Sequence, residues 1–337
     1  MLGLADASAT YSCDWNMLMP KIGRFEVSPQ GFGAMGLSSV YGQADDAASI
    51  ATLHRAIELG VTFFDTATAY GTGHNEELIG RALREKRSGL VIASKFIHGQ
   101  SGEGEPKVSA REAVEASLKR LGLDHIDIYY LHRIDPDVPV EESIGQLGRL
   151  VDEGKIGGVG ISEASADQLR RGHATYEITA LQSEYSLWTR EVEDEILPTA
   201  RELGIGFVAY SPLGRGFLAG ALPTEANDRR NIHPRFRSEA VEANASRRRR
   251  IEDVARRIGA TPAQVSLAWV LAKQVVPIPG TRHIAHLEAN WQANDILLDA
   301  ATIAELDAAF PQGTTAGDRY PPEQLKQVPP ARVTANV

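Results

Sequence analysis

The sequence predicts an α/β fold: a single (β/α)8 TIM barrel with a β-hairpin before its first strand and extended loops at the carboxyl ends of its strands. Short apolar runs rich in β-branched residues alternate with segments of helical periodicity along nearly the whole chain, and no shift in composition divides it. The connections require parallel strands, and eight in succession favour a closed barrel over an open sheet. The 337 residues, of which 43% are hydrophobic, can bury a large core.

The expected elements begin with two short strands around a turn at 21–28, which would cover the bottom of the barrel. The barrel strands are expected to start at Gly31, Val61, Leu90, Ile126, Ile156, Ile178, Ile205 and Val275. Helical periodicity covers 46–59, 75–86, 109–121, 140–152, 166–173, 191–203, 246–258, 262–272 and 285–293. Ser109 and Glu112 form a capping box, and Gly60 ends the first helix. The polar segment 213–245 would form a large loop on the carboxyl face.

Domain organisation and composition narrow the class of protein. Residues 21–310 are expected to form the barrel, with 1–20 a loose leader and 311–337 a C-terminal tail. A net charge of -9 argues against nucleic-acid partners, and the basic run 247–250 has the helical spacing of a solvated face. Cys13 is the one cysteine, so no intramolecular disulfide can form. No apolar run approaches the ~18 residues of a membrane span, and the expected setting is the cytoplasm.

Three consecutive predicted strands end in side chains of complementary chemistry. Asp65 ends the second strand, Lys95 the third and His132 the fourth, and Tyr70 lies in the loop after the second. A barrel brings the carboxyl ends of its strands around one opening. A tyrosine, with a pKa of about 10, donates a proton near neutrality only if a cation stabilises its phenolate, and a lysine held by a carboxylate supplies that cation. Each residue alone has a structural explanation, but together they predict a catalytic site.

Two other motifs suggest different functions but lack the required context. Gly31, Gly33 and Gly36 satisfy the dinucleotide-binding pattern G-x-G-x-x-G, yet that pattern should open directly into a helix, and helical periodicity begins only near residue 46. The run around Ser162, GISEA, comes close to the G-x-S-x-G of serine hydrolases but lacks the final glycine. Neither the Rossmann domain nor the hydrolase is therefore favoured.

The strand-end motifs resemble those of the aldo-keto reductase family over about residues 21–310. The motifs are DTATAYG, SK, YYLHRID, GVGISEAS, LQSEYSLWTR, AYSPLGRGFLAG and PIPGTR, and they are most similar to the branch that contains plant and bacterial ketone and aldehyde reductases and potassium-channel β-subunits. The resemblance implies NADP-dependent, reversible reduction of an aldehyde or ketone. Tyr70 would be the general acid and base, and Lys95, held by Asp65, would lower the pKa of Tyr70. His132 would orient and polarise the carbonyl oxygen. No metal is expected.

The same resemblance implies the residues that bind NADP(H). Those for the nicotinamide carboxamide would be Ser162, Glu163 and Gln182, and Tyr210 would stack on the ring. Those for the pyrophosphate would be Ser211, Leu213, Gly214 and Arg215. Those near the adenosine would be Gly280, Thr281, Arg282, His286 and Asn290.

Arg282 favours the 2′-phosphate of NADP over the ribose of NAD. Two residues depart from the family pattern there: His286 stands where a more basic residue is usual, and Ala289 where a glutamate is usual. Asn290 is then left to hold the adenine edge alone. The departures predict either a shallower preference for NADP than is typical of the family or a less tightly fixed adenine.

The substrate is expected to be a small, hydrophobic carbonyl compound or alcohol, because the residues expected to line its pocket are apolar or aromatic: Met35, Tyr41, Phe96 and Trp188. The loop after the seventh strand and the tail after Phe310 are expected to contribute further residues to this pocket. An alternative is a slow-turnover regulatory subunit that keeps the fold and the cofactor and binds a partner. Turnover of simple aldehydes would distinguish the two. Apolar helix faces look alike whether they cover strands or a neighbouring copy, so the sequence makes no prediction of oligomeric state.

Overall fold

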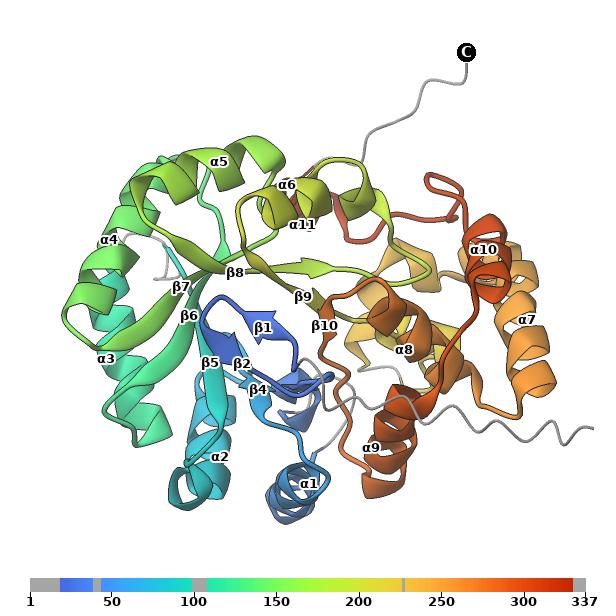
Figure 1. Ribbon diagram of the computed structural model, residues 1–337, viewed down its shortest axis with the longest axis horizontal. Coiled ribbons are helices and arrows are strands. Elements are labelled where there is room, and N and C mark those ends of the chain that lie inside the picture. The colour runs from blue at the N-terminus through green and yellow to red at the C-terminus, as the bar shows by residue number, and fades with distance from the viewer. Residues whose placement is uncertain (1–18, 39–43, 99–107, 226–227, 330–337) are drawn as a thin grey trace, which may run out of the picture.

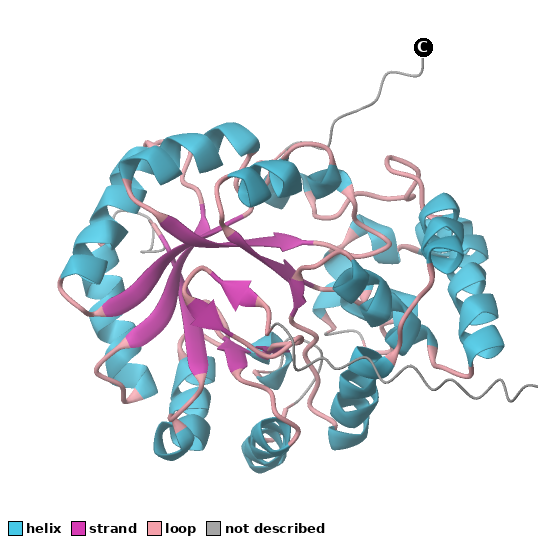
Figure 2. Cartoon of the chain, in the orientation of Figure 1, coloured by secondary structure: helices cyan, strands magenta, loops and turns pink. Residues whose placement is uncertain are grey.

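The structure is a computed structural model that describes residues 19–38, 44–98, 108–225 and 228–329. Eight parallel strands form one curled sheet in the order β10-β9-β8-β7-β6-β5-β4-β3, with helices around its outside (Figures 1 and 2). The strands are β3 (Phe32–Gly33), β4 (Phe63–Asp65), β5 (Val91–Ile97), β6 (Ile126–Arg133), β7 (Ile156–Ser162), β8 (Ile178–Glu184), β9 (Gly206–Tyr210) and β10 (Val276–Pro277). This arrangement confirms the predicted (β/α)8 fold.

The first and last strands of the sheet meet at a seam made of glycines. The Gly31 amide donates to the carbonyl of Pro277 at 2.9 Å, which closes the ring between the two ends of the sheet. A Cβ atom on Gly33 would lie 2.7 Å from the Ile278 carbonyl oxygen, and one on Gly280 would lie 2.2 Å from the Gly33 carbonyl oxygen. Glycine is therefore required by the close approach of two backbones. The G-x-G pattern serves barrel closure rather than a dinucleotide-binding turn.

The α-helices are α1 (Asp46–Glu58), α2 (His74–Leu83), α3 (Ala110–Leu121), α4 (Val140–Asp152), α5 (Ala166–Thr175), α6 (Ile196–Glu202), α7 (Ser238–Ile258), α8 (Pro262–Ala272), α9 (Ile284–Trp291), α10 (Ala300–Ala309) and α11 (Pro322–Leu325). The 3-10 helices are η2 (Ala34–Leu37), η3 (Arg84–Lys86), η4 (Glu191–Glu193), η5 (Gly214–Ala219), η6 (Arg229–Ile232), η7 (Pro234–Phe236) and η8 (Gln292–Asp295). The capping box of Ser109 and Glu112 starts α3 as predicted. Gly60 follows α1 with a φ of 97°.

Several boundaries differ from the sequence prediction. The first strand is only two residues long and η2 follows it, because the seam ends where the chain turns away from β10. The helix predicted at 191–203 is divided into η4 and α6. Helix α7 begins at Ser238 rather than 246. Its first turns are rich in alanine and glutamate, so they show little of the apolar periodicity on which the prediction relied. The earlier start of α7 makes the loop after β9 shorter than expected. Helix α10 was not predicted at all.

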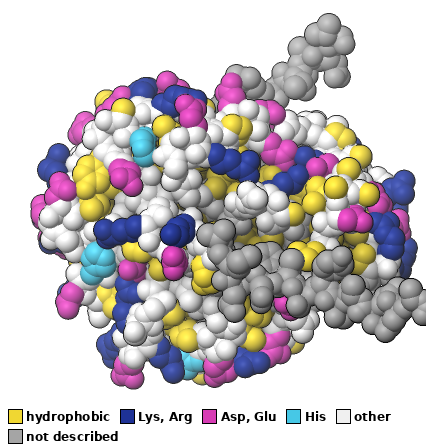
Figure 3. Space-filling view, viewed as in Figure 1, with side chains coloured by type: hydrophobic (Ala, Val, Ile, Leu, Met, Phe, Trp, Pro, Cys, Tyr) yellow, Lys and Arg dark blue, Asp and Glu magenta, His cyan; other side chains and the backbone are white. Residues whose placement is uncertain are grey.

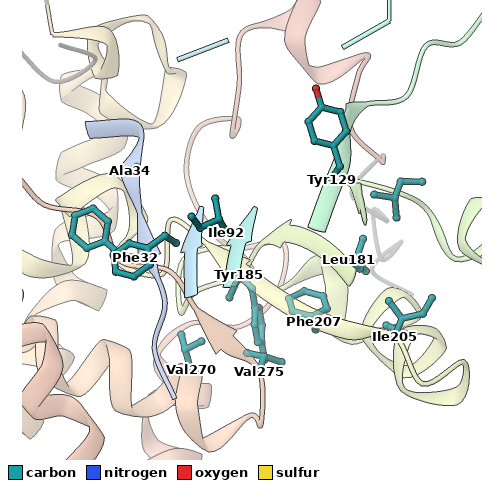
Figure 4. Packing of buried hydrophobic residues seen from close by; sticks show 14 of the residues in the cluster. Phe32, Ala34, Ile92, Tyr129, Leu181, Tyr185, Ile205, Phe207, Val270 and Val275 are labelled. Atoms are coloured by element: carbon teal, nitrogen blue, oxygen red, sulfur yellow. The ribbon is translucent and has the colours of Figure 1, made fainter. Parts of the chain in front are cut away.

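The strands divide the buried side chains into two layers because successive residues point to opposite faces. One cluster fills the barrel and contains Phe63, Val91, Ala93, Ile128, Tyr130, Ala180, Val208, Val276 and Ile278. The larger cluster lies between the sheet and the helices, and Figure 4 shows part of it, with Ile92, Tyr129 and Phe207 contributed by different strands. Residues at the strand ends that continue the inward series therefore face the mouth of the barrel.

The predicted hairpin closes the other end of the barrel. Strands β1 (Lys21–Ile22) and β2 (Phe25–Glu26) are antiparallel, and Figure 1 shows them in the middle of the ring of strands. Ile22 is fully buried in the interior cluster, where a Cβ atom on Gly206 would lie 2.6 Å from its Cα. The hairpin thus blocks the bottom, and access to the interior is from the carboxyl ends of the strands.

On the surface, Figure 3 shows acidic and basic side chains interspersed over the face in view. Arg249 and Arg250 lie on α7 with exposed side chains, as the sequence predicts for a solvated helix face. Within the described ranges, no helix combines the length and the apolar character needed to cross a bilayer.

Candidate active site

One corner of the barrel mouth is built from the ends of β4, β5 and β6. Asp65 continues the inward series after Phe63, and Lys95 continues that of Val91 and Ala93. The Lys95 ammonium is fully buried, forms an ion pair with Asp65, and donates to the Thr66 carbonyl at 2.9 Å. It also lies 3.3 Å from the Tyr70 hydroxyl. The structure therefore brings a carboxylate, an ammonium and a phenol into one chain of hydrogen bonds.

The charged state of Lys95 follows from its neighbours. Burial disfavours the ammonium, but the Asp65 carboxylate and the hydrogen bonds to Asp65 and Tyr70 outweigh burial and raise the pKa of Lys95 above its ordinary value. Gln182 donates to the other oxygen of Asp65 at 2.7 Å, so both carboxylate oxygens are hydrogen-bonded. A buried charge is retained in this way only when it is paired and hydrogen-bonded.

Tyr70 experiences two opposing influences. Burial raises the pKa of its phenol, and the Lys95 ammonium lowers it. Lys95 thus acts in the expected direction, but burial outweighs it and the pKa of Tyr70 lies above its ordinary value. The phenol is consequently protonated at neutral pH, as a proton donor must be.

His132 ends the interior series of β6 and faces Tyr70. The two rings meet edge to face, with centroids 5.9 Å apart and an interplanar angle of 87°. Burial, reinforced by the charges of Arg133 and Lys95, lowers the pKa of His132 well below its ordinary value. The imidazole is therefore neutral near pH 7. Its buried Nδ1 has no hydrogen-bond partner among the described residues.

The opposite wall of the mouth is formed by β7, β8 and β9. Ser162, Glu163 and Gln182 are buried there, and Tyr210 is half-buried at the end of β9. Glu163 has a left-handed φ of 54° and accepts hydrogen bonds from the Tyr210 hydroxyl at 2.8 Å and the Glu184 amide at 2.9 Å. These residues, far apart in sequence, are brought together as the strand order requires.

Glu163 and Tyr210 have partners that the sequence reasoning missed. The Arg319 guanidinium donates to Glu163 at 2.7 Å, and the Tyr320 hydroxyl lies 2.7 Å from that of Tyr210. Burial opposes ionisation of Glu163, but Arg319 and Arg133 outweigh it and lower the pKa of the carboxyl. Arg319 and Tyr320 lie in the predicted tail, beyond every strand, so no periodicity marked them. Residues 315–320 of the tail therefore pack against the mouth of the barrel.

The chain after β9 adopts a run of left-handed backbone conformations. Ser211, Gly214, Arg215 and Gly216 have φ values of 50°, 56°, 55° and 96°. Left-handed turns of this kind occur at anion-binding sites; here the Gly214 and Gly216 amides donate within the turn, to the Ser211 and Leu213 carbonyls at 2.8 Å and 3.0 Å. Arg215 forms an ion pair with Glu184 at 3.3 Å, and Leu213 is partly buried beside it.

The residues expected near the adenosine lie at the seam, between β10 and α9. Gly280 is exposed, and the Thr281 hydroxyl accepts a hydrogen bond from the His283 amide at 3.1 Å, one residue before α9 begins. His286 is exposed in the first turns of this helix, and Asn290 is buried near its end. Arg282 is partly buried in the same connection.

The residues expected to line the substrate pocket are distributed unequally. Met35 is partly exposed in η2, and Trp188 is buried in the loop after β8, where its ring stacks on Phe217 with centroids 4.0 Å apart. Phe96 does not face the mouth: its ring stacks on Tyr129 in the layer between the sheet and the helices. The expectation for Phe96 was wrong because it alternates with the inward-facing Lys95. Tyr41 lies outside the described residues.

The charge of the opposite wall of the mouth, together with the loop after β9, fits an anionic cofactor. Its arginines are Arg133, Arg215, Arg235 and Arg319, and its buried carboxylates are Glu163 and Glu184. Guanidinium groups thus outnumber these buried carboxylates beside the left-handed amides of the loop after β9. Excess positive charge in a desolvated site is favourable for a ligand that carries phosphate groups.

Comparison with known proteins identifies the class. Residues 30–310 match the profile of the Aldo/keto reductase family. The chain is 46% identical over 309 residues to the protein named Probable aldo-keto reductase 1 of Glycine max, a match that covers 88% of this chain and 89% of that protein. The chain therefore belongs to the aldo-keto reductase family, and its family is one of oxidoreductases.

Solved structures show the same relationship. A glycerol dehydrogenase from Gluconobacter oxydans superposes with a TM-score of 0.74 at 27% identity, over 85% of this chain and 92% of that one. An aldo-keto reductase from Klebsiella pneumoniae, crystallised with NADPH, superposes with a TM-score of 0.71 at 29% identity, over 89% of this chain and 99% of that one.

Proposed function

We propose that the protein is an NADP(H)-dependent reductase that reversibly converts an aldehyde or ketone to an alcohol. The observation that carries the proposal is the position of the Lys95 ammonium, which contacts both the Asp65 carboxylate and, at 3.3 Å, the Tyr70 hydroxyl. A phenol beside a fixed, buried cation is suited to donate a proton and to be left as a stabilised phenolate.

The four residues of the strand-end corner divide the acid–base chemistry. Tyr70 donates its proton to the carbonyl oxygen as that oxygen gains negative charge, and Lys95 stabilises the resulting phenolate. Asp65 holds Lys95. His132, whose lowered pKa keeps it neutral, donates a hydrogen bond that orients and polarises the carbonyl. In the reverse direction the phenolate accepts a proton from an alcohol.

The cofactor is held by the opposite wall and by the seam. Ser162, Glu163 and Gln182 would hold the carboxamide of the nicotinamide, and Tyr210 would provide a surface for its ring. When bound, the nicotinamide supplies the hydride in reduction and accepts it in oxidation. The pyrophosphate is bound by Ser211, Leu213, Gly214 and Arg215, and the adenosine end by Gly280, Thr281, Arg282, His286 and Asn290. Support comes from the left-handed turn at 211–216 and from the excess of arginines beside it.

The substrate is a small hydrophobic carbonyl compound. Trp188 and Met35 would line its approach: the Trp188 ring stacks on Phe217, and the Arg235 guanidinium lies 5.3 Å from the centroid of the Trp188 ring. These side chains suit a substrate whose one carbonyl is bound by Tyr70 and His132 and whose remaining body is apolar.

A screen of aldehydes, ketones and secondary alcohols with NADP(H) and NAD(H), followed by the absorbance of the reduced nicotinamide, tests the proposal. Tyr70→Phe is expected to lower turnover by about 10²- to 10⁴-fold, the contribution of a general acid, while the affinity for NADPH is retained. Tyr176→Phe, at a hydroxyl bonded to Asp152 on the outer helices, is the matched control.

Unchanged turnover in Tyr70→Phe would contradict the proposal. Cofactor binding by the native chain without turnover of any compound would instead favour a slow-turnover, partner-binding subunit.

A further inference from the structure

The C-terminal tail is fixed to the mouth of the barrel by a series of hydrogen bonds. The Thr315 hydroxyl donates to the Trp188 carbonyl at 3.2 Å, and the Ala316 amide donates to the side chain of Asn244 on α7 at 3.0 Å. The Gly317 carbonyl accepts from Arg235 at 3.2 Å. The segment that precedes Arg319 is thereby held at both the loop after β8 and helix α7.

Arg319 makes the strongest polar contact of the tail with the barrel. Its guanidinium pairs with Glu163 at 2.7 Å, and the side chains are 11% and 3% exposed, so the ion pair is almost completely desolvated. Removing one partner from such a pair leaves an uncompensated buried charge. The orientation of the Glu163 carboxylate therefore depends on a residue that lies 156 positions away in the chain.

Tyr320 forms a second bridge. Its hydroxyl lies 2.7 Å from the Tyr210 hydroxyl and 3.5 Å from a nitrogen of Arg133. Two guanidinium groups lie near its ring, that of Arg215 at 5.0 Å and that of Arg319 at 5.5 Å from the ring centroid. The contact with Tyr210 joins the two hydroxyl groups. It therefore fixes the orientation of the Tyr210 ring and leaves the face of that ring available to the nicotinamide.

We propose that the tail is part of the cofactor site, and that Arg319 and Tyr320 are positioning residues for the nicotinamide half of NADP(H). This inference rests on the proposed function, which gives Glu163 and Tyr210 to the nicotinamide. Arg319 holds the Glu163 carboxylate, and Tyr320 holds the Tyr210 ring. Both act through residues that contact the cofactor, and the docked tail completes the site.

The opposite arrangement, in which the tail excludes the cofactor, makes opposite predictions. A tail that competes with NADPH would weaken cofactor binding, and loosening it would improve the affinity. A tail that positions the site strengthens binding, and by reciprocity bound NADPH must then hold the tail more firmly.

The first test measures the affinity of the full chain for NADPH directly, by the change in protein fluorescence. Arg319→Met is expected to raise the dissociation constant about tenfold, the effect of one charge-assisted hydrogen bond. Arg319→Lys, which keeps a cation, should recover most of this loss, and Tyr320→Phe should cost about threefold, the effect of one neutral hydrogen bond. Lys326→Met, at an exposed ion pair with Glu323 in the same tail, is the matched control.

The kinetic readout separates positioning from a general loss of stability. Arg319→Met should raise the KM for NADPH by more than it lowers kcat at saturating NADPH. A variant that is merely less folded would instead lower kcat without changing the dissociation constant of the remaining folded protein.

The second test is trypsin cleavage of the native chain within the tail, where Arg319 and Lys326 supply sites. Saturating NADPH should slow this cleavage several-fold. Two outcomes would overturn the inference if the native chain still bound NADPH. One is faster cleavage of the tail with NADPH. The other is an unchanged or improved affinity for NADPH in both Arg319→Met and Tyr320→Phe. A native chain that failed to bind NADPH would instead contradict the proposed function itself.

Discussion

The two sides of the barrel mouth are built in different ways. The corner at the ends of β4, β5 and β6 is made of strand residues and the loop that directly follows, and the ion pair of Asp65 and Lys95 is enclosed by the barrel itself. The opposite wall joins strand ends to distant segments, since Glu163 pairs with Arg319 of the tail and Glu184 with Arg215 of the loop after β9. The first side is fixed once the sheet forms, and the second also requires the loops and the tail to dock.

The largest expected effect is the loss of stability when the ion pair of Lys95 and Asp65 is broken, and the comparison between the two sides depends on it. Lys95→Met leaves the Asp65 carboxylate buried without its cation, and we expect the free energy of unfolding to fall by about 3–5 kcal/mol. Lys155→Met, at a partly exposed pair with Glu115, should change it by at most about 1 kcal/mol. Denaturant unfolding of both variants is the measurement. Equal losses would show that the strand-end corner is no more dependent on its ion pair than the surface is.

The second prediction compares the two sides by the pH dependence of the free energy of unfolding. The pKa of His132 in the corner is lowered by burial, and that of Glu163 in the opposite wall is lowered by arginines that outweigh burial. Both contributions to stability are present above the unfolded-state pKa and are lost as the pH falls. The loss from His132 begins near pH 6.5, whereas that from Glu163 begins only near pH 4.3.

Replacement of His132 should therefore flatten the stability profile between pH 6.5 and 5. The native chain is expected to lose up to about 2 kcal/mol from this group at pH 5, and His132→Gln should not. Urea unfolding at a series of pH values measures the difference, with His286→Gln on an exposed helix as the control. A profile as steep in His132→Gln as in the native chain would refute the assignment.

The smallest expected effect is on cofactor preference and concerns Arg282, in the connection between β10 and α9. Arg282→Ala should weaken the binding of NADP by about tenfold and that of NAD hardly at all, because only NADP carries the 2′-phosphate. Burial raises the pKa of Asp228, but hydrogen bonds and charge from Arg230 outweigh it, with a smaller contribution from Arg282. The native preference for NADP should be modest because His286 and Ala289 stand where the family usually has a more basic residue and a glutamate. Dissociation constants for both cofactors test this prediction, and equal losses for NADP and NAD would contradict it.

The same contrast explains what the sequence could predict. Asp65, Lys95 and His132 were found because each ends a predicted strand, and the ends of neighbouring parallel strands must meet. Phe96 was misplaced because successive strand residues point to opposite faces of the sheet, so the residue after the inward-facing Lys95 points toward the helices. Arg319 and Tyr320 were missed because their position depends on how a tail without periodicity folds back, which only the packing of Trp188, Asn244 and Arg235 determines.

The glycine seam limits how this mouth can be reshaped. Any side chain at Gly280 would have to displace the carbonyl oxygen of Gly33, which lies 2.2 Å from the site of its Cβ, so the ring cannot be widened at that joint without separating its two ends. Redesign toward bulkier compounds is consequently restricted to the borders of the entrance away from this joint, and substitutions at Trp188 or in the tail offer room that the joint denies.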